Sequence, residues 1–502
     1  MTKIFTPLLL VCISLNAHSQ NVGIGTDVPT HPLHIVAPSN PLRIEGLQLA
    51  DDADSVLTVD INGVVRKKSS VSTVALTGWS TTGNGATNTA TNFLGTTDLK
   101  PLMFRTNNQG SGFIDPDAPT RNNAIGNRSL PFGITGSGNN AFGYTALANL
   151  TIGSGNTAVG DSAAYGITIG NNNIAIGSST LVAAAAAGGN IAIGSNALRN
   201  NLSSENIAIG KDASAANIAG FNNLAVGTAA LQRNTNGNTQ LAIGGNALQA
   251  INGGQENIAI GYNAGLGIAS SNYNVLLGHY ALSSTAGSSR NTVMGHNAAI
   301  SYSASGNGDN VFIGYQNALS QTGGNGNSYI GAGIDVAGNF SPNNSSALGQ
   351  EAVITANNQV RIGNTNVNSI GGQVGWTTFS DSRIKKNVQE DVPGLAFIER
   401  LKPVTYNYDV QALRKLQGNK GAADNSGFGN IRFTGLLAQD VEAVANSIGY
   451  SFSGIDKPAN GQTPYGIRYA ELVVPLIKAM QEMKTLIDKQ QREIEELKEK
   501  IK

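Results

Sequence analysis

The sequence predicts a mainly β protein, in which a β-solenoid of about 17-residue rungs precedes a small α+β domain ending in a long coiled-coil helix. Three observations lead to this: a short repeat, 62 glycines among 502 residues, and a charged fraction of only 13%. A fixed short period indicates stacked units that are each too small to bury a core alone. The glycines that close the repeated stretches stand at positions 126, 143, 160, 177, 194, 210, 227, 244, 261, 278, 295, 314, 331, 349 and 363.

Each unit reads Asn, apolar, Ala, apolar, Gly, as in residues 173–177 and 257–261. A large apolar residue on either side of Ala indicates a short strand with one large and one small apolar face. A strand covered on both faces implies a core inside the coil and a second contact outside it. We hypothesise that the Ala face is where chains meet in an oligomer. The Asn recurs four residues before the glycine in most units and predicts a ladder of stacked side-chain amides.

The first 20 residues resemble a cleaved signal peptide. Lys3 is followed by an apolar run over residues 4–15 and by small residues at 17 and 19. The run is short for a membrane span, which argues against an anchor. Cys12, the single cysteine, lies within it, so the mature chain is expected to contain no disulfide and no thiolate metal site. No later stretch is apolar enough to span a membrane. The chain is therefore expected at the cell surface, associated with the outer membrane, or outside the cell.

Several functions are disfavoured by the sequence. The formal net charge is zero and no basic-aromatic surface is evident, which argues against nucleic acid as a partner. The lysine after Gly210 is followed by Asp212, so the usual phosphate-binding loop is absent. Acidic residues are sparse over 121–363, which disfavours a two-carboxylate glycosidase. His279 and His296 should stack on neighbouring rungs, more as surface decoration than as metal ligands. No metal or cofactor is expected.

The last quarter has a different character, since it holds about half of the Lys and Arg residues and a similar number of acids. From Tyr469 onward, apolar residues recur at intervals of three and four, which favours a coiled coil over a helix packed on its own domain. The seam residues slightly favour two strands, although the polar Gln490 weakens that preference. The seam consists of Val473, Leu476, Met480, Met483, Ile487, Gln490, Ile494, Leu497 and Ile501.

Four blocks in residues 380–502 carry a resemblance to a known family. They read SDSRIKKNV (380–388), LKPVTYNY (401–408), FTGLLAQDVE (433–442) and YGIRYAELVVPLIKAMQEM (465–483). In this order they resemble the C-terminal intramolecular chaperone domain of phage tail spikes and tail fibres, which is also a self-cleaving Ser–Lys peptidase family. The repeats over about residues 120–365 resemble, in pattern alone, the head repeats of trimeric autotransporter adhesins.

The first resemblance implies a domain that trimerises, templates the folding of the fibre before it and then cuts itself off. The implied cleavage site is the bond between Phe379 and Ser380, with Ser380 and Lys385 as the catalytic pair. The family pattern Ser-Asp-x-Arg-x-Lys-x-Asn is met in full by Ser380, Asp381, Arg383, Lys385 and Asn387.

The chemistry of the pair sets a geometric condition. A serine hydroxyl needs a base to remove its proton, and a lysine is a base only when neutral, which requires a pKa far below about 10.4. The nearest cations in sequence are Arg383 and Lys386. A spacing of five places Ser380 and Lys385 on opposite faces of a strand and leaves them poorly matched on a helix. We therefore expect either a turn between them or a lysine from another subunit, and we hypothesise that cleavage awaits assembly.

Together these observations predict an exported, homotrimeric, fibre- or adhesin-like structural protein with a removable chaperone. Its partners would be copies of itself and a surface glycan or cell-surface receptor, and its only enzymatic activity would be cleavage of its own chain. The alternative is a phage or phage-derived tail fibre or spike with receptor-binding or glycan-degrading activity. The expected organisation is a signal peptide (1–20), N-terminal β segments (21–120), the solenoid (121–365), a linker (366–379), the chaperone and autoprocessing domain (380–468) and the coiled-coil helix (469–502).

Overall fold

The structure is a computed structural model that describes most of the chain in two separate units, Met1–Gly95 and Thr96–Lys502. The predicted signal peptide, with Cys12, lies outside the described residues. The described residues are 22–30, 33–36, 55–59, 61–62, 65–69, 93–116, 120–284, 287–338, 340–417, 427–461 and 463–502.

The N-terminal unit contains two pairs of short strands. Strand β1 (Val22–Ile24) pairs in parallel with β2 (Leu33–Ile35). Strand β3 (Ser55–Val59) pairs antiparallel with β4 (Val65–Ser69).

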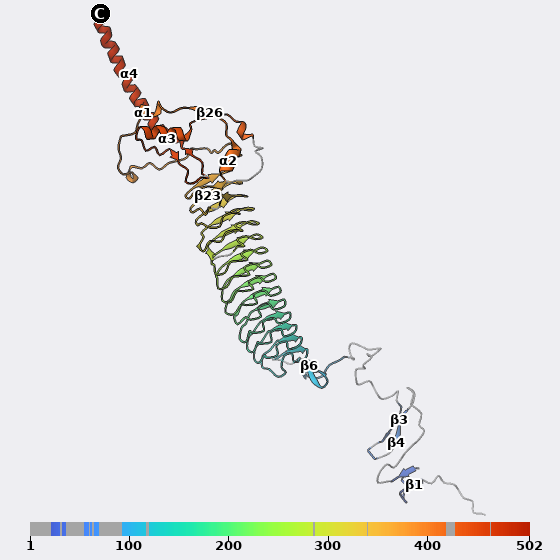
Figure 1. Ribbon diagram of the computed structural model, residues 1–502. Coiled ribbons are helices and arrows are strands. Elements are labelled where there is room, and N and C mark those ends of the chain that lie inside the picture. Colours follow the sequence, from blue (N-terminus) through green and yellow to red (C-terminus); the bar gives the residue numbers. More distant parts are fainter. Residues whose placement is uncertain are drawn as a thin grey trace, which may run out of the picture. The chain divides into compact units, whose positions relative to one another are not determined.

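The second unit is dominated by a β-solenoid, as the sequence predicts (Figure 1). Its three-residue strands pair in parallel and in register, so that each contacts the equivalent strand of the next rung. The strands are β7 (Asn123–Ile125), β8 (Asn140–Phe142), β9 (Thr157–Val159), β10 (Ile174–Ile176), β11 (Ile191–Ile193), β12 (Ile207–Ile209), β13 (Leu224–Val226), β14 (Leu241–Ile243), β15 (Ile258–Ile260), β16 (Val275–Leu277), β18 (Thr292–Met294), β20 (Val311–Ile313), β21 (Ser328–Ile330), β23 (Ser346–Leu348) and β25 (Val360–Ile362).

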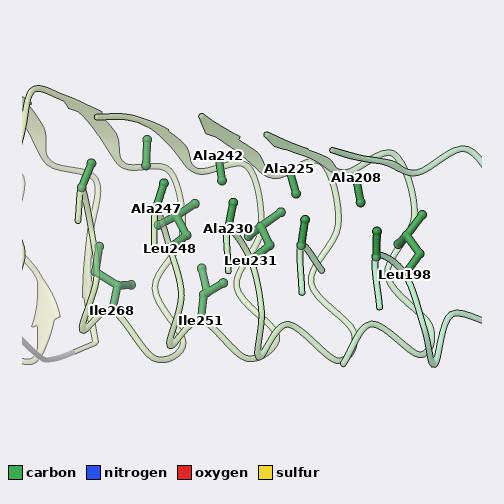
Figure 2. Close-up of a cluster of buried hydrophobic side chains, with 14 of the residues drawn as sticks. Leu198, Ala208, Ala225, Ala230, Leu231, Ala242, Ala247, Leu248, Ile251 and Ile268 are labelled. Carbon is green, nitrogen blue, oxygen red and sulfur yellow. The ribbon is translucent and has the colours of Figure 1, made fainter. Parts of the chain in front are cut away.

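The core of the solenoid is formed by small residues. In most rungs the central Ala of the strand points inward and faces small or apolar residues from the turn of the same coil, as Figure 2 shows for Ala242, Ala247 and Leu248. All three side chains are fully buried. In the rungs whose strands carry Ala, from Ala124 to Ala259, the coil is therefore so narrow that close packing leaves little space for a larger side chain at this position.

The hypothesis that chains meet through the Ala face is wrong, because that face lines the interior of the coil. The large apolar residues that flank each Ala point outward instead. Ile125, Ile176, Ile209 and Ile260 are each more than a third exposed, whereas Ala175 between its two isoleucines is fully buried. Both faces are apolar, so the repeat alone did not distinguish inside from outside.

The inward column of residues changes along the solenoid. From Ala124 to Ala259 every strand contributes Ala, and all are fully buried. The following four strands contribute Leu276, Val293, Phe312 and Tyr329. Phe312 packs against Tyr329 and against Tyr302 of a turn, with ring centroids 5.2 and 6.0 Å apart. Ala347 and Arg361 complete the column.

The predicted asparagine ladder is confirmed and lies buried beside the strands. The amide oxygen of Asn156 accepts hydrogen bonds from the main-chain N–H and the side-chain amide of Asn173, both at 3.0 Å. Its own amide nitrogen donates to Asn139 and to the carbonyl of Gly170. In one of the rungs without an Asn at this position, Gln240 makes the equivalent contacts.

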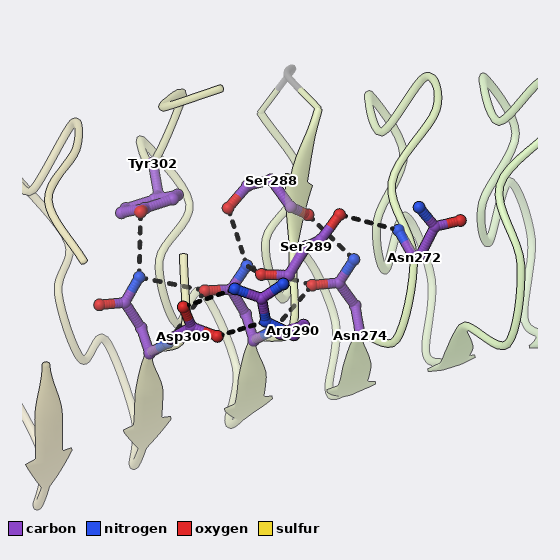
Figure 3. A network of polar contacts seen from close by, with 9 residues as sticks. Asn272, Asn274, Ser288, Ser289, Arg290, Tyr302 and Asp309 are labelled. Atoms are coloured by element: carbon purple, nitrogen blue, oxygen red, sulfur yellow. Dashed lines mark hydrogen bonds and ion pairs between the residues drawn. The ribbon is translucent and has the colours of Figure 1, made fainter. Parts of the chain in front are cut away.

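The ladder also recruits side chains from the turns. In Figure 3, Asn274 donates a hydrogen bond to the carbonyl of Ser288. The Tyr302 hydroxyl accepts a hydrogen bond from the side-chain amide of Asn310. On the surface of the same rungs, Arg290 makes a two-pronged ion pair with Asp309. The buried amides of the ladder thus find their partners in the neighbouring rung, which ties each rung to the register of the next.

The backbone of each rung has positions with positive φ, which are occupied either by glycine or by other residues. The closing glycines approach the next rung closely: a Cβ on Gly143, at φ +139°, would lie 2.3 Å from the carbonyl oxygen of Gly160. Two and four residues after most closing glycines, non-glycine residues also have positive φ. After Gly244 these are Asn246, at φ +57°, and Leu248, at φ +49°. Asn tolerates this conformation, whereas Ala and Leu adopt it at a cost of roughly 1–2 kcal/mol each.

The first rung is covered by a β-hairpin. Strand β5 (Leu102–Thr106) pairs antiparallel with β6 (Gln109–Ile114), and β6 pairs antiparallel with β7. Phe113 from β6 is buried at the end of the core and packs edge-on against Phe132. The hairpin therefore protects the edge strand of this end of the solenoid from further pairing.

The C-terminal region is a small α+β domain. Its buried centre is formed by Phe397, Val441, Ala445 and Leu472. Its elements are η1 (Ser382–Ile384), α1 (Leu395–Ile398), β26 (Val404–Tyr406), α2 (Val410–Leu416), η2 (Phe428–Asn430), β27 (Phe433–Gly435), α3 (Ala438–Ser447), β28 (Ile455–Asp456), β29 (Gly466–Ile467), η3 (Tyr469–Leu472) and α4 (Val473–Ile501).

The ladder predicts a large local effect of Asn156→Ala. The substitution leaves the N–H of Asn173 and the carbonyl of Gly170 buried without this partner, so we expect a loss of about 2–4 kcal/mol. Because long repeat arrays unfold locally, the measurement is hydrogen exchange at residues 170–177, which should become faster. Exposed Asn200→Ala is the control and should change nothing; equal effects of both variants would contradict the role of the ladder.

The left-handed positions predict a stabilising variant, Ala229→Asn. Ala229 has φ +57° and occupies the position of Asp212 and Asn246 in the adjacent rungs, where Asn196–Asp212 and Asn246–Asn263 side chains pair. We expect the opening free energy of this rung to rise by about 1 kcal/mol, measured as slower hydrogen exchange. Thr228→Asn, one residue earlier and exposed, should give no gain. Faster exchange in the Ala229 variant would refute the prediction.

Candidate functional site

The segment around the predicted cleavage bond is exposed from residue 366 to residue 391. Within it the chain makes a single turn of 3₁₀-helix, η1. Asp381 caps this turn because its carboxylate accepts a hydrogen bond from the N–H of Arg383 at 2.8 Å. The Arg383 guanidinium also donates to the same carboxylate, and these bonds hold the pKa of Asp381 below its ordinary value. The Asp-x-Arg spacing of the motif thus folds the chain back on itself.

The turn brings Ser380 and Lys385 together. The Lys385 ammonium donates a hydrogen bond to the Ser380 hydroxyl at 2.7 Å, within one chain. The sequence required either a turn between the two residues or a lysine from another subunit, and the single chain has the turn. Asn387, the last residue of the motif, has φ +55°, a conformation that Asn tolerates better than most residues. Phe379, on the other side of the bond, is 90% exposed.

The other three sequence blocks, residues 401–408, 433–442 and 465–483, pack together in the domain that follows this segment. Residues 401–408 contain β26, which pairs antiparallel with β27 from the third block. The fourth block contributes Tyr469, whose hydroxyl accepts a hydrogen bond from the N–H of Leu436 at 2.8 Å. The blocks are therefore explained by one packed domain, in which distant segments contact one another.

Helix α4 projects from this domain (Figure 1), and the apolar side chains of its seam are exposed. Only Pro475 and Ala479 of the helix are buried, and Glu482 anchors its first turns by accepting a hydrogen bond from the N–H of Leu395 at 2.7 Å. Met480 is 70% exposed and Leu497 57% exposed. The helix is thus not packed on its own domain over most of its length.

Two further sets of residues bear on function. His279 and His296 do stack on neighbouring rungs, with centroids 6.2 Å apart, and Tyr315 continues the stack. Among the described residues, no group of three or more His, Cys, Asp or Glu side chains is placed to hold a metal ion. Asp335 is partly buried, which raises its pKa, and its carboxylate accepts hydrogen bonds from the N–H groups of Ser320 and Val336. These contacts give it a structural role.

The fold and this segment define a class: a β-solenoid followed by a small C-terminal domain that begins with a serine–lysine contact. Residues 380–450 match the family described as chaperone of endosialidase, which supports the predicted intramolecular chaperone domain of tail-fibre and tail-spike proteins. That family implies self-association into trimers and fits a surface-exposed or extracellular, tail-fibre-like protein. No curated protein and no solved structure matches the chain. The resemblance of the repeats to adhesin heads stays a prediction.

None of the helices in the described part of the chain has the length and apolar character that a membrane crossing requires.

Proposed function

We propose that the chain is an exported, homotrimeric, fibre- or adhesin-like protein whose C-terminal chaperone aligns three chains, folds them and then detaches itself by cleavage between Phe379 and Ser380. The observation that carries this proposal is the 2.7 Å contact between Lys385 and Ser380 at the first residues of the family match. The uncovered seam of α4 and the outward apolar face of the solenoid support the trimer.

The proposed cut follows ordinary acyl chemistry. Lys385 accepts the proton of the Ser380 hydroxyl, whose oxygen bonds to the carbonyl carbon of Phe379. The peptide C–N bond then breaks and the α-amine of Ser380 takes up a proton. Water hydrolyses the resulting ester, which leaves a carboxylate on Phe379 and restores the serine hydroxyl.

Assembly is the proposed trigger. In the single chain both members of the pair lie in an exposed segment, and a protonated lysine is not a base. Burial against other subunits favours the neutral form of an amine. Cleavage therefore follows alignment of the chains, so that the chaperone is retained until it has acted.

The outward face of the solenoid is the proposed contact between the fibre parts of the three chains. It presents a continuous apolar column over many rungs, far larger than the scattered apolar residues of an ordinary surface. Exposed members of this column are Ile125, Phe142, Val159, Ile176, Ile209, Ile260, Met294, Ile330, Leu348 and Ile362.

The alternative function is a phage or phage-derived tail fibre or spike that binds a receptor or degrades a glycan. The family match favours it as much as the leading proposal. The two differ in export, which cell fractionation tests, and in glycan degradation, which a depolymerisation assay tests. A surface glycan or cell-surface receptor is the proposed partner in both.

Self-cleavage predicts two fragments that differ from the intact chain. Mass spectrometry of the purified protein should find a C-terminal fragment that begins at Ser380. Ser380→Ala and Lys385→Ala should each reduce the cleaved fraction at least a hundredfold, because one removes the nucleophile and the other the base. Lys386→Ala, the adjacent lysine, is the matched control and should cleave normally. An intact wild-type chain in correctly assembled trimers would refute the proposal.

The seam of α4 predicts which residues hold the trimer before cleavage. In a chain kept whole by Ser380→Ala, Met483→Asp with Ile487→Asp places charges at the seam and should abolish trimers, measured by light scattering after size-exclusion chromatography. The control, Thr485→Asp with Arg492→Asp, changes the opposite face and should remain trimeric. Trimers of the seam variant equal to those of the control would exclude the coiled coil as the alignment device.

A further inference from the structure

The C-terminal end of the solenoid is covered by the chaperone domain through hydrogen bonds to the last turn. The carbonyl oxygen of Thr355, a fully buried residue, accepts one hydrogen bond from the Thr463 hydroxyl and one from the Asn460 side-chain amide, both at 3.0 Å. Thr463 is itself 9% exposed. These donors come from a loop more than a hundred residues later in the chain, between β28 and β29.

The loop that provides these donors is held in shape by its own hydrogen bonds. The amide oxygen of Asn460 accepts a hydrogen bond from the main-chain N–H of Thr463 at 3.0 Å, while the Thr463 hydroxyl donates its one proton to Thr355. The two donors are thus fixed relative to each other before they contact Thr355. Preorganisation of this kind reduces the entropy that docking costs.

A second contact lies beside the first. Arg414 of α2 reaches Thr365 and Asn366 just after the last strand, at 3.3 and 3.4 Å. The two contacts border a cavity of about 730 Å³ between the last rung and the chaperone domain. The chaperone therefore engages the end of the solenoid at two separated points.

The last strand, β25, carries a positively charged residue on the side that the chaperone domain covers. Arg361 occupies the inward position that holds Ala in most other strands, and burial lowers its pKa while Asp456 of the chaperone opposes that effect. A partly buried cation is more stable with a carboxylate in its surroundings than without one. The charge of the final rung is thus complementary to the charge of Asp456 in the chaperone domain.

We propose that the loop at Asn460 and Thr463, with Thr355, is a non-covalent latch that holds the chaperone on the last rung, so that the two parts stay together after the chain is cut. This inference rests on the proposed cleavage at Phe379–Ser380. In this account detachment takes two steps: the cut breaks the covalent link, and the chaperone leaves only when the latch has also opened. The domain that covers the C-terminal end of the solenoid is thus the chaperone domain of the same chain.

The experiment separates docking from self-cleavage. The full chain carries Ser380→Ala, and residues 371–375 of the exposed linker are replaced by the recognition site of a specific protease. After the protease has cut, size-exclusion chromatography shows whether the two pieces elute together. Because an added protease makes the cut, the result is independent of whether the chain cleaves itself.

With the native loop, the nicked pieces should elute together. Asn460→Ala with Thr463→Val removes both donors and leaves the Thr355 carbonyl unpaired, so at least a tenfold weaker association is expected and the pieces should separate. Thr463→Ser keeps the hydroxyl and should hold the pieces together, as should Thr434→Val, an exposed threonine of the same domain. Circular dichroism before nicking confirms that each variant is folded.

The latch is overturned if the native pieces separate as readily as those of the double variant, or if the double variant stays together like the native protein. If the double variant does not fold, the comparison between Thr463→Val and Thr463→Ser decides in its place. Equal retention in these two variants would then exclude the Thr463 hydroxyl as the holding contact.

Discussion

The in-register stacking of identical short strands is the constraint on which the rest of the structure depends. Each buried Asn bonds to the next rung through both its main chain and its side chain, so a rung is complete only when its neighbour is aligned. This tight stacking forces glycine where the backbones approach, and small residues where the coil is narrow. A single rung has almost no core of its own, and its stability is a property of the stack.

The same constraint creates a difficulty that the C-terminal domain is suited to resolve. Nearly identical rungs pair almost as well when they are displaced by one repeat, and three chains multiply the number of wrong alignments. In the proposed assembly, the seam on α4 joins the chains before the rungs form, which would remove most of these alternatives. The two ends of the solenoid are then treated differently: a hairpin of the same sheet covers the first rung, and a separate domain covers the last.

Much of the fold could be predicted because its periodicity is explicit in the sequence. The glycine spacing gave the rung length, and the recurring Asn gave the buried ladder. The inward direction of Ala could not be predicted, since both strand faces are apolar and only the three-dimensional width of the coil decides between them. The substitution of Gln240 for Asn in the ladder also escaped prediction, although its position in the repeat was a usable signal.

The candidate site was only partly predictable. The motif identified Ser380 and Lys385, and their spacing required a turn, but the Asp381 cap that makes it became evident only in the structure. The contact of Thr355 with Thr463 had no sequence signal, because the two residues are 108 positions apart and neither belongs to a repeat or motif. Contacts of this kind depend on tertiary packing alone.

The inward residues change along the solenoid, so a wrong alignment of the rungs costs more at its C-terminal end than at its N-terminal end. Nine successive rungs with Ala are interchangeable, whereas Leu276, Val293, Phe312, Tyr329 and Arg361 each suit one neighbour. A one-rung displacement there would force an aromatic ring or a charge into a space shaped for another residue, at roughly 1–3 kcal/mol or more per site. If the rungs form in order from the chaperone end, these selective positions pair first. They then set the register of the alanine rungs, which are too alike to set it themselves.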